Sequence, residues 1–332
     1  MVAEQAGVHR TTVSLAMKGH PSIPEATRRR IMEIAEALGY APDPMLSALA
    51  VYRNSNRPAH FHGTLAWLVD QLMVPTWRRN LHFKEYFAGA TRQARYHGYE
   101  LEVFNVNTPD MPSRRLASVL RARNIVGILL CPQRKPHTRL VFPFEDFCAV
   151  TFGYSLEDPK LHTVAGAHYS AIRQTIREVR RRGYRRIGFV GLRGNDSKLD
   201  NTHLAAYLAE DFLSADGGKV RPLYEEAIDS SMLASWFRRN KPDAFITSHP
   251  SIMELLKNTG IVYPKVGIGY PGLPGPNAEL CGITEESAKM GAVAVDFLVS
   301  MIQHGRRGLP LCPQRLLVEG LWNEGKSLHP AK

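Results

Sequence analysis

The stretch GVHRTTVSLAMKGHPSIPEATRRRI, residues 7–31, decides the fold of the N-terminal part of this chain. Both halves carry apolar residues at i, i+3 and i+4 spacing, which predicts two helices that each bury one face. These residues are Val13, Ala16 and Met17 in the first half, and Ile31, continued by Ile34, Ala35 and Leu38, in the second. The segment 18–24 between them holds a glycine and two prolines, so we expect a loop there.

A third, shorter apolar stripe lies upstream, within residues 2–6. Gly7 is expected to end this first helix, because glycine adopts a left-handed turn at low cost. The third helix should begin at Pro24-Glu25, where a proline loses no hydrogen bond and a carboxylate meets the positive end of the helix. The sequence therefore predicts helix, short turn, helix, loop, helix within residues 1–41.

The polar face of the second helix has the chemistry of a groove reader. Arginine can bond guanine bidentately, threonine can bond a base edge or contact a thymine methyl, and serine or lysine can hold phosphate. If the apolar stripe faces inward, the outward residues are Arg10, Thr11, Thr12, Ser14, Leu15 and Lys18. An ordinary three-helix bundle with a polar surface has the same periodicity, so spacing alone leaves both interpretations open.

Residue identity favours DNA binding. The segments VAEQAGVHRTTVSLAMKG, residues 2–19, and IPEATRRRIMEIAEALGYAPD, residues 23–43, closely resemble the DNA-binding head of the LacI/GalR family of bacterial transcription regulators. The resemblance implies that Arg10 and Thr11 read bases, and that Thr27 and Tyr40 contact the DNA backbone. Leu15 stands where many members have arginine, and His9 replaces the usual N-cap serine. Relatives usually carry several more residues before the segment matching Val2, so we expect a truncated first helix.

Residues 42–60 are expected to form a hinge and linker. Prolines flank a short apolar turn that includes Met45, Leu46 and Leu49, and a helix this short is marginal in water unless something covers it. In the family that the head resembles, two hinge helices pair in a dimer and press a leucine into the minor groove. This implies that Leu49 is the inserted side chain. A stub that packs on its own protein is the alternative.

Beyond residue 60 the chain alternates between strand and helix patterns. GTLAWLV, ELEVFNV and IVGILLC predict strands, and the segments between them predict amphipathic helices. A second set of alternating segments follows residue 160. This order is typical of doubly wound α/β folds with parallel sheets.

The whole region resembles the two-lobed, periplasmic-binding-protein-like effector domain of the same family. The resemblance implies an effector-binding domain over residues 61–332, with lobe one at about 61–157 plus 286–318 and lobe two at about 163–285. The end of the chain carries the family's closing signature, at Glu319, Gly320, Trp322, Gly325 and Ser327. No leucine-heptad segment follows Lys332, so we expect a homodimer.

Ligands of such folds bind between the lobes, at the carboxyl ends of strands. Polar or aromatic residues near those ends are the candidates for binding an effector: Asp70, Trp77, Tyr154, His203, His249 and Tyr270. Many relatives have arginine, asparagine and aspartate near the positions of His203, His249 and Tyr270. This chain retains none of the three, which argues against simply importing a sugar or purine ligand from the family. A small metabolite is still expected, with a sugar as one candidate.

Composition excludes several other classes of protein. The formal net charge is +11, but residues 1–60 hold seven Lys/Arg against five Asp/Glu, so the excess charge lies mostly elsewhere. The four cysteines are not clustered, no run is long enough to span a membrane, and no catalytic or cofactor-binding motif is present. We expect a cytoplasmic, dimeric regulator, most simply a repressor, that binds a double-stranded DNA operator without metal or cofactor. The alternative is a solute-binding protein without a DNA function.

Overall fold

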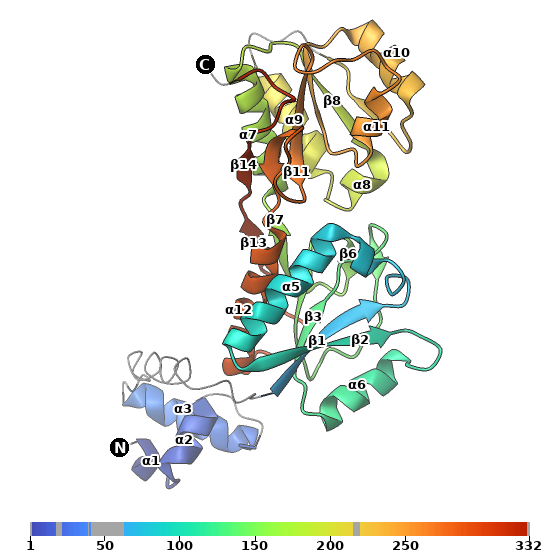
Figure 1. Ribbon diagram of the computed structural model, residues 1–332. Helices are drawn as coiled ribbons and strands as arrows, with labels where there is room; N and C mark the ends of the chain where they lie inside the picture. The colour runs from blue at the N-terminus through green and yellow to red at the C-terminus, as the bar shows by residue number, and fades with distance from the viewer. Residues whose placement is uncertain (1, 18–21, 39, 41–62, 215–219, 331–332) are drawn as a thin grey trace.

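The computed structural model describes residues 2–17, 22–38, 40, 63–214 and 220–330. They form a small helical head and two α/β lobes stacked end to end (Figure 1). The head contains α1 (Val2–Gln5), α2 (Arg10–Met17) and α3 (Glu25–Ala37). The predicted hinge over residues 42–60 with Leu49, and the candidate DNA contact Lys18, lie outside the described residues.

The three head helices pack as the apolar spacing predicts. Val13 and Ala16 of α2 are buried against Ile31 and Ala35 of α3, and the stripe of α1 completes this core. Gly7 has a φ of +60°, the left-handed turn expected after the first helix. Pro24 directly precedes α3 at its N-cap position, as predicted.

Lobe one is a six-stranded parallel sheet in the order β13-β7-β5-β3-β1-β2. Its strands are β1 (Gly63–Asp70), β2 (Tyr99–Val106), β3 (Gly127–Leu130), β5 (Cys148–Phe152), β7 (His162–Gly166) and β13 (Arg315–Val318). Its helices are η1 (Trp77–Arg79), α5 (Leu81–Tyr96), α6 (Ser113–Ala122) and α12 (Ser287–Gln303). A separate two-stranded sheet pairs β4 (Thr138–Arg139) with β6 (Leu156–Asp158).

Strand β1 is buried on both faces, which explains its continuous apolar run. Leu65, Trp67 and Val69 pack in one cluster with residues of α5 and α12, whereas Ala66 and Leu68 pack in another with residues of α6. Because successive side chains of a strand point to opposite faces, this alternation places helices on both sides of the sheet.

Lobe two is a second six-stranded sheet, in the order β14-β12-β11-β10-β8-β9. Its strands are β8 (Ile187–Leu192), β9 (Leu223–Glu225), β10 (Ala244–Thr247), β11 (Gly267–Leu273), β12 (Cys281–Thr284) and β14 (Leu321–Asn323). Its helices are α7 (His168–Arg181), α8 (Arg193–Ser197), α9 (Thr202–Leu213), α10 (Ser230–Asn240) and α11 (Ile252–Leu256). The edge strand β14 runs antiparallel to β12. We expected a purely parallel sheet, so the prediction is wrong for this one strand.

The chain crosses between lobes at points that differ from the expected boundaries. Strand β7, expected at the beginning of lobe two, pairs with β5 and β13 in the sheet of lobe one. The first crossing therefore falls after Gly166, and the second lies between β12 and α12. A third crossing follows β13, because β14 belongs to lobe two. Short strands beside a crossover have no periodicity that assigns them to one sheet.

The closing signature fastens the end of the chain to lobe two. A side chain at Gly320 would overlap the carbonyl oxygen of Thr284, so only glycine fits there. The Ser327 hydroxyl donates to the carbonyl of Ile268 at 2.6 Å and accepts from the backbone N–H of Cys281 at 2.8 Å. These two bonds hold the final segment against β11 and β12.

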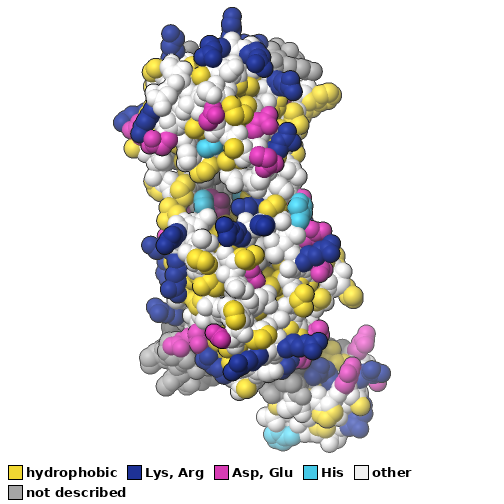
Figure 2. Space-filling view, turned by 90° about the vertical axis from the view of Figure 1, so that its right-hand side faces the viewer, with side chains coloured by type: hydrophobic (Ala, Val, Ile, Leu, Met, Phe, Trp, Pro, Cys, Tyr) yellow, Lys and Arg dark blue, Asp and Glu magenta, His cyan; other side chains and the backbone are white. Residues whose placement is uncertain are grey.

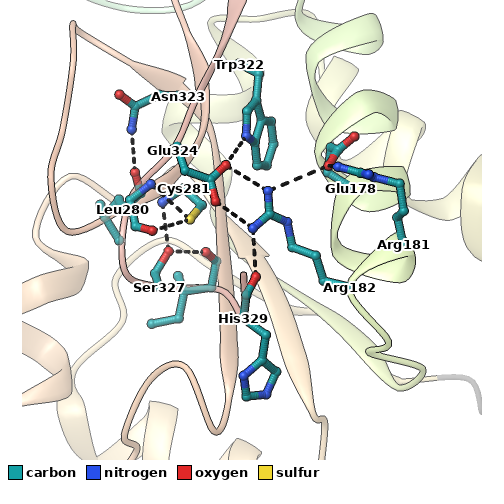
Figure 3. A network of polar contacts seen from close by, with 12 residues as sticks. Glu178, Arg181, Arg182, Leu280, Cys281, Trp322, Asn323, Glu324, Ser327 and His329 are labelled. Carbon is teal, nitrogen blue, oxygen red and sulfur yellow. Dashed lines mark hydrogen bonds and ion pairs between the residues drawn. The ribbon is translucent and has the colours of Figure 1, made fainter. Parts of the chain in front are cut away.

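A buried arginine joins α7 to the same final segment (Figure 3). The Arg182 guanidinium donates to both carboxylate oxygens of Glu324, at 2.7 and 2.8 Å, and to the carbonyl of His329 at 2.7 Å. Trp322 lies under the guanidinium, with 5.4 Å from the ring centroid to the guanidinium carbon, and its indole N–H donates to Glu324. This arrangement, which we call the Arg182 network, connects the last residues of the chain to the C-terminal end of α7.

Along the described segments, no helix combines the length and apolar character that crossing a membrane requires.

Candidate functional site

The first candidate site is the exposed beginning of α2. Arg10 and Thr11 are exposed and Thr12 is half-buried, while Val13 is buried in the core of the head. The orientation predicted for the start of the helix therefore matches the structure. The side chain of Ser14 lies outside the described residues.

His9 caps α2 in place of the expected serine. Its Nδ1 atom lies 3.4 Å from the backbone nitrogen of Thr11, which donates to it, and 2.8 Å from the Thr11 hydroxyl oxygen. An imidazole nitrogen can thus accept the N–H that a serine oxygen usually accepts at an N-cap. The same nitrogen also orients the Thr11 hydroxyl.

Leu15 differs from the expectation of a fully outward side chain. It is half-buried and packs against the core of the head. Thr27 is half-buried in the first turn of α3, and Tyr40 is 49% exposed, with its backbone N–H bonded to the carbonyl of Ala35. Among the predicted DNA contacts of α2 whose side chains are described, the ridge available to a groove is formed by Arg10, Thr11 and Thr12.

The second candidate site lies between the lobes. The first-lobe face presents the carboxyl ends of β1 and β3, and the second-lobe face presents those of β8 and β10, where each strand order reverses. Such reversals are the usual ligand sites of open α/β sheets. The lobes touch across this region, since the Ser197 hydroxyl lies 3.3 Å from Nε2 of His137. Figure 2 shows histidine, acidic and basic side chains along the groove at the waist of the molecule.

Three of the six predicted effector residues come together in this groove. The His203 Nδ1 atom lies 3.2 Å from the hydroxyl of Ser248, whose carbonyl accepts from the Tyr270 hydroxyl at 3.2 Å. The His168 ring lies between those of His203 and Tyr154, with centroid distances of 5.6 and 6.2 Å. Tyr154, His168 and His203 therefore form a row of rings, and Tyr270 is joined to His203 through Ser248.

The other three predicted effector residues serve the structure. Trp77 is buried and packs on Trp67 and Phe87 in the core of lobe one. The Asp70 carboxylate accepts from the side chain of Asn107 at 3.1 Å and so joins the ends of β1 and β2. His249 accepts from the backbone N–H of Ser251 through Nδ1, directly before α11.

A polar cluster around Glu285 was missed by the sequence analysis. The Glu285 carboxylate accepts from the hydroxyls of Tyr86 and Ser287 and lies 3.5 Å from Nδ1 of His82. Burial acts to raise the pKa of Glu285, but His82, His168 and the two hydroxyl donors outweigh it and hold the pKa below its ordinary value. We call this set of residues, which lies where the chain crosses between the lobes and is distinct from the predicted hinge over residues 42–60, the hinge cluster: Glu285, His82, Tyr86, His168 and Ser287. A pocket beside the crossovers is lined by His168, Glu285, Gly166 and Gly320, among others.

The sequence contained a usable signal for this cluster. His82 and His168 lie in the first turns of α5 and α7, and Ser287 begins α12. Helices that follow parallel strands begin at the ligand-binding edge, so polar residues in their first turns are candidates. Glu285 itself has no such signal, because two adjacent carboxylates before a helix are typical of ordinary helix-start charges.

His203 lies in the first turn of α9, which a carboxylate of α8 caps. The buried Asp196 carboxylate accepts from the backbone N–H groups of His203 and Leu204, both at 3.0 Å, and so caps α9. Burial raises the pKa of Asp196 in spite of these bonds. Within the described part of the chain, Nε2 of His203 is buried without a hydrogen-bond partner.

Lowering the pH from 7 to 5 should reduce the free energy of unfolding by about 2 kcal/mol through His203 alone. Burial lowers the pKa of His203 from 6.5 to about 3, so the unfolded chain takes up a proton in this range and the folded chain does not. Stability is therefore lost as the pH falls below 6.5. Urea unfolding at the two pH values measures the effect.

The matched variant is His203→Gln, which removes the titrating group and keeps a side chain that can bond Ser248. Between pH 7 and pH 5 this variant should lose about 2 kcal/mol less unfolding free energy than the natural protein. His304→Gln, at an exposed histidine after α12, should behave like the natural protein. An equal loss in all three proteins would contradict a neutral buried His203.

Comparison with known proteins agrees with this geometry. Residues 2–43 match the family model described as bacterial regulatory proteins, lacI family. The regulator PtxS of Pseudomonas putida is 28% identical over 60% of this chain and 56% of its own length. The repressor CytR of Escherichia coli K12 is 25% identical over 57% of this chain and 52% of its own. The chain thus spans about half the length of these curated relatives.

Solved structures share the fold over nearly the full chain. A complex of the transcriptional regulator CelR with cellobiose has a TM-score of 0.55 at 18% identity, covering 98% of each chain. The lac repressor dimer bound to operator and the anti-inducer ONPF has a TM-score of 0.54 at 16% identity, covering 98% of this chain and 97% of the other. At these identities the likeness shows the fold alone.

Proposed function

This chain belongs to the LacI family, and from that premise we propose that it is a transcriptional regulator that binds a DNA operator as a homodimer and responds to a small metabolite. The observation that carries the proposal is the beginning of α2, where Arg10 and Thr11 are exposed while Val13 and Ala16 of the same helix are buried. Such a helix end can enter the major groove, where arginine and threonine reach base edges. A role on operator DNA places the protein in the cytoplasm.

The effector site proposed here is the groove between the lobes. The hinge cluster offers a carboxylate whose pKa is held below its ordinary value and which accepts hydrogen bonds when ionised. Burial lowers the pKa of both His168 and His203, which favours the neutral form of each ring. This chemistry favours a neutral ligand with several hydroxyl groups, such as a sugar, because each hydroxyl both donates and accepts. A carboxylate or phosphate next to Glu285 would instead be repelled.

The response is proposed to arise from a change in the angle between the lobes. Three crossings of the chain join the lobes, and the hinge cluster links α5 of lobe one with the first turn of α7 in lobe two. A ligand that favours one angle needs only a few kcal/mol of differential binding to change the population substantially. In the dimer this would alter the spacing of the two heads, with repression of transcription as the expected ground state.

The DNA function is tested by selecting binding sites from a random duplex library with the full-length chain. We expect enrichment of a two-fold symmetric site whose affinity falls steeply with rising salt, because lysine and arginine displace counterions from phosphate. Failure to enrich any sequence at low salt would refute the DNA function and leave a solute-binding protein.

The effector class is tested by thermal shift with a panel of neutral sugars and the corresponding sugar acids. A neutral sugar at ~100 times its Kd should stabilise the protein by ~2.7 kcal/mol, and the acids should not. Glu285→Gln should weaken that sugar by roughly 10- to 100-fold, the usual loss for a hydrogen bond to a charged group. Glu286→Gln, at the adjacent carboxylate, should leave binding unchanged. Stabilisation by the acids alone would reverse the assigned class.

A further inference from the structure

Helix α9 is apolar on two opposite sides. Its inner side buries Ala206 and Tyr207 in the core of lobe two. Its outer side carries a second stripe at i, i+3, i+4 and i+7, formed by Ala205, Leu208, Ala209 and Phe212. Leu208 is 47% exposed and Phe212 is 81% exposed. An exposed apolar stripe of this kind is normally covered by a partner, and the described residues of the chain leave this one open at Leu208 and Phe212.

Arginines of α7 line one flank of this helix. Arg173, Arg177 and Arg180 all approach the carboxylate of Glu210, with nitrogen-to-oxygen distances of 2.6, 3.6 and 3.5 Å. Three guanidinium groups therefore share one buried carboxylate, and two positive charges remain in excess. Arg177 is the most open of the three, with 61% of its side chain exposed.

We propose that the outer stripe of α9 with this arginine row is a docking surface for an acidic amphipathic helix of a partner protein. The stripe would receive apolar residues at the same helical spacing, and the arginines would receive carboxylates along one flank. The charge excess favours such a partner over a second copy of this chain. A second copy would present the same arginine row, which offers no row of carboxylates to this one.

The proposal concerns lobe two and does not depend on the DNA function. The test uses the full-length protein and two fluorescent helical peptides with identical leucines at i, i+3, i+4 and i+7. One peptide carries glutamate on both flanks of the stripe, and the other carries lysine. We expect the glutamate peptide to bind in an anisotropy titration, with affinity that falls as salt rises, and the lysine peptide not to bind.

Variants of exposed residues locate the surface. Leu208→Ser together with Phe212→Ser should weaken the glutamate peptide ~10-fold or more, since these are the two large exposed anchors. Arg177→Glu should also weaken binding of the glutamate peptide, and it should create some affinity for the lysine peptide. Val141→Ser, at an 82% exposed valine of lobe one, is the matched control and should change nothing.

Three outcomes would overturn the proposal. They are no binding of the glutamate peptide, equal binding of both peptides, and binding that the α9 double variant does not change. Sedimentation equilibrium, which measures the oligomeric state, tests whether a second copy of the chain covers the stripe instead. If the double variant dissociates an oligomer of the natural protein, the stripe is covered by a second copy and the acidic partner is refuted.

Discussion

Arg182→Ala is expected to lower the free energy of unfolding by about 3 kcal/mol, the low end of the range for breaking a buried ion pair. Only 1% of the Arg182 side chain is exposed, and its guanidinium bonds Glu324 bidentately and the carbonyl of His329. Removing it takes the Arg182 donors from the His329 carbonyl and from Glu324, which keeps the indole N–H of Trp322, and it opens a gap beside the Trp322 ring. The loss stays at the low end because Glu324 is 57% exposed and can recruit water.

Urea unfolding followed by tryptophan fluorescence measures this loss, because Trp322 lies in the Arg182 network itself. Arg181→Ala provides the control at the neighbouring position, where 55% of the side chain is exposed and pairs with Glu178. That variant should lose less than ~1 kcal/mol, as exposed pairs do. If the two variants unfold at the same urea concentration, the buried network does not hold the end of the chain.

The Arg182 network illustrates what a sequence can and cannot predict. Arginines 177–186 resemble a solvated helix end, and most of them are exposed. Arg182 is buried because the final segment of the chain, about 140 residues later, brings Glu324 and the His329 carbonyl to it. Helical spacing is local and predicts the helix, but a partner at such a distance along the chain has no local signature.

The same distinction separates the two candidate sites. The start of α2 could be predicted because its apolar spacing, its preceding turn and its polar ridge lie within ten residues. The groove between the lobes could be predicted only in outline. Trp77 and His249 follow strands as expected, yet one packs into the core and the other caps a turn. Glu285 and His82 were missed because their proximity depends on how α5 and α12 pack.

Arg10→Ala is expected to weaken binding of the operator strongly, and the symmetry of the proposed dimer increases this loss of affinity. A bidentate contact between arginine and guanine contributes ~1–3 kcal/mol of discrimination, and an operator with two half-sites would lose it twice. We therefore expect at least ~30-fold weaker binding to the selected duplex. Arg10→Lys should also bind more weakly, because an ammonium keeps the charge without the planar fork.

The pattern of the loss distinguishes base reading by Arg10 from a phosphate contact. If Arg10 reads a base, Arg10→Ala should erase the preference at one base pair in each half-site and leave the salt dependence nearly unchanged. Arg95→Ala, at an exposed arginine near the end of α5, should bind like the natural protein. Uniform weakening across all duplexes, with a salt slope reduced by ~1 for each head, would mean that Arg10 holds phosphate. In that case Thr11 and its neighbours would read the bases of the operator. His9 already orients the Thr11 hydroxyl.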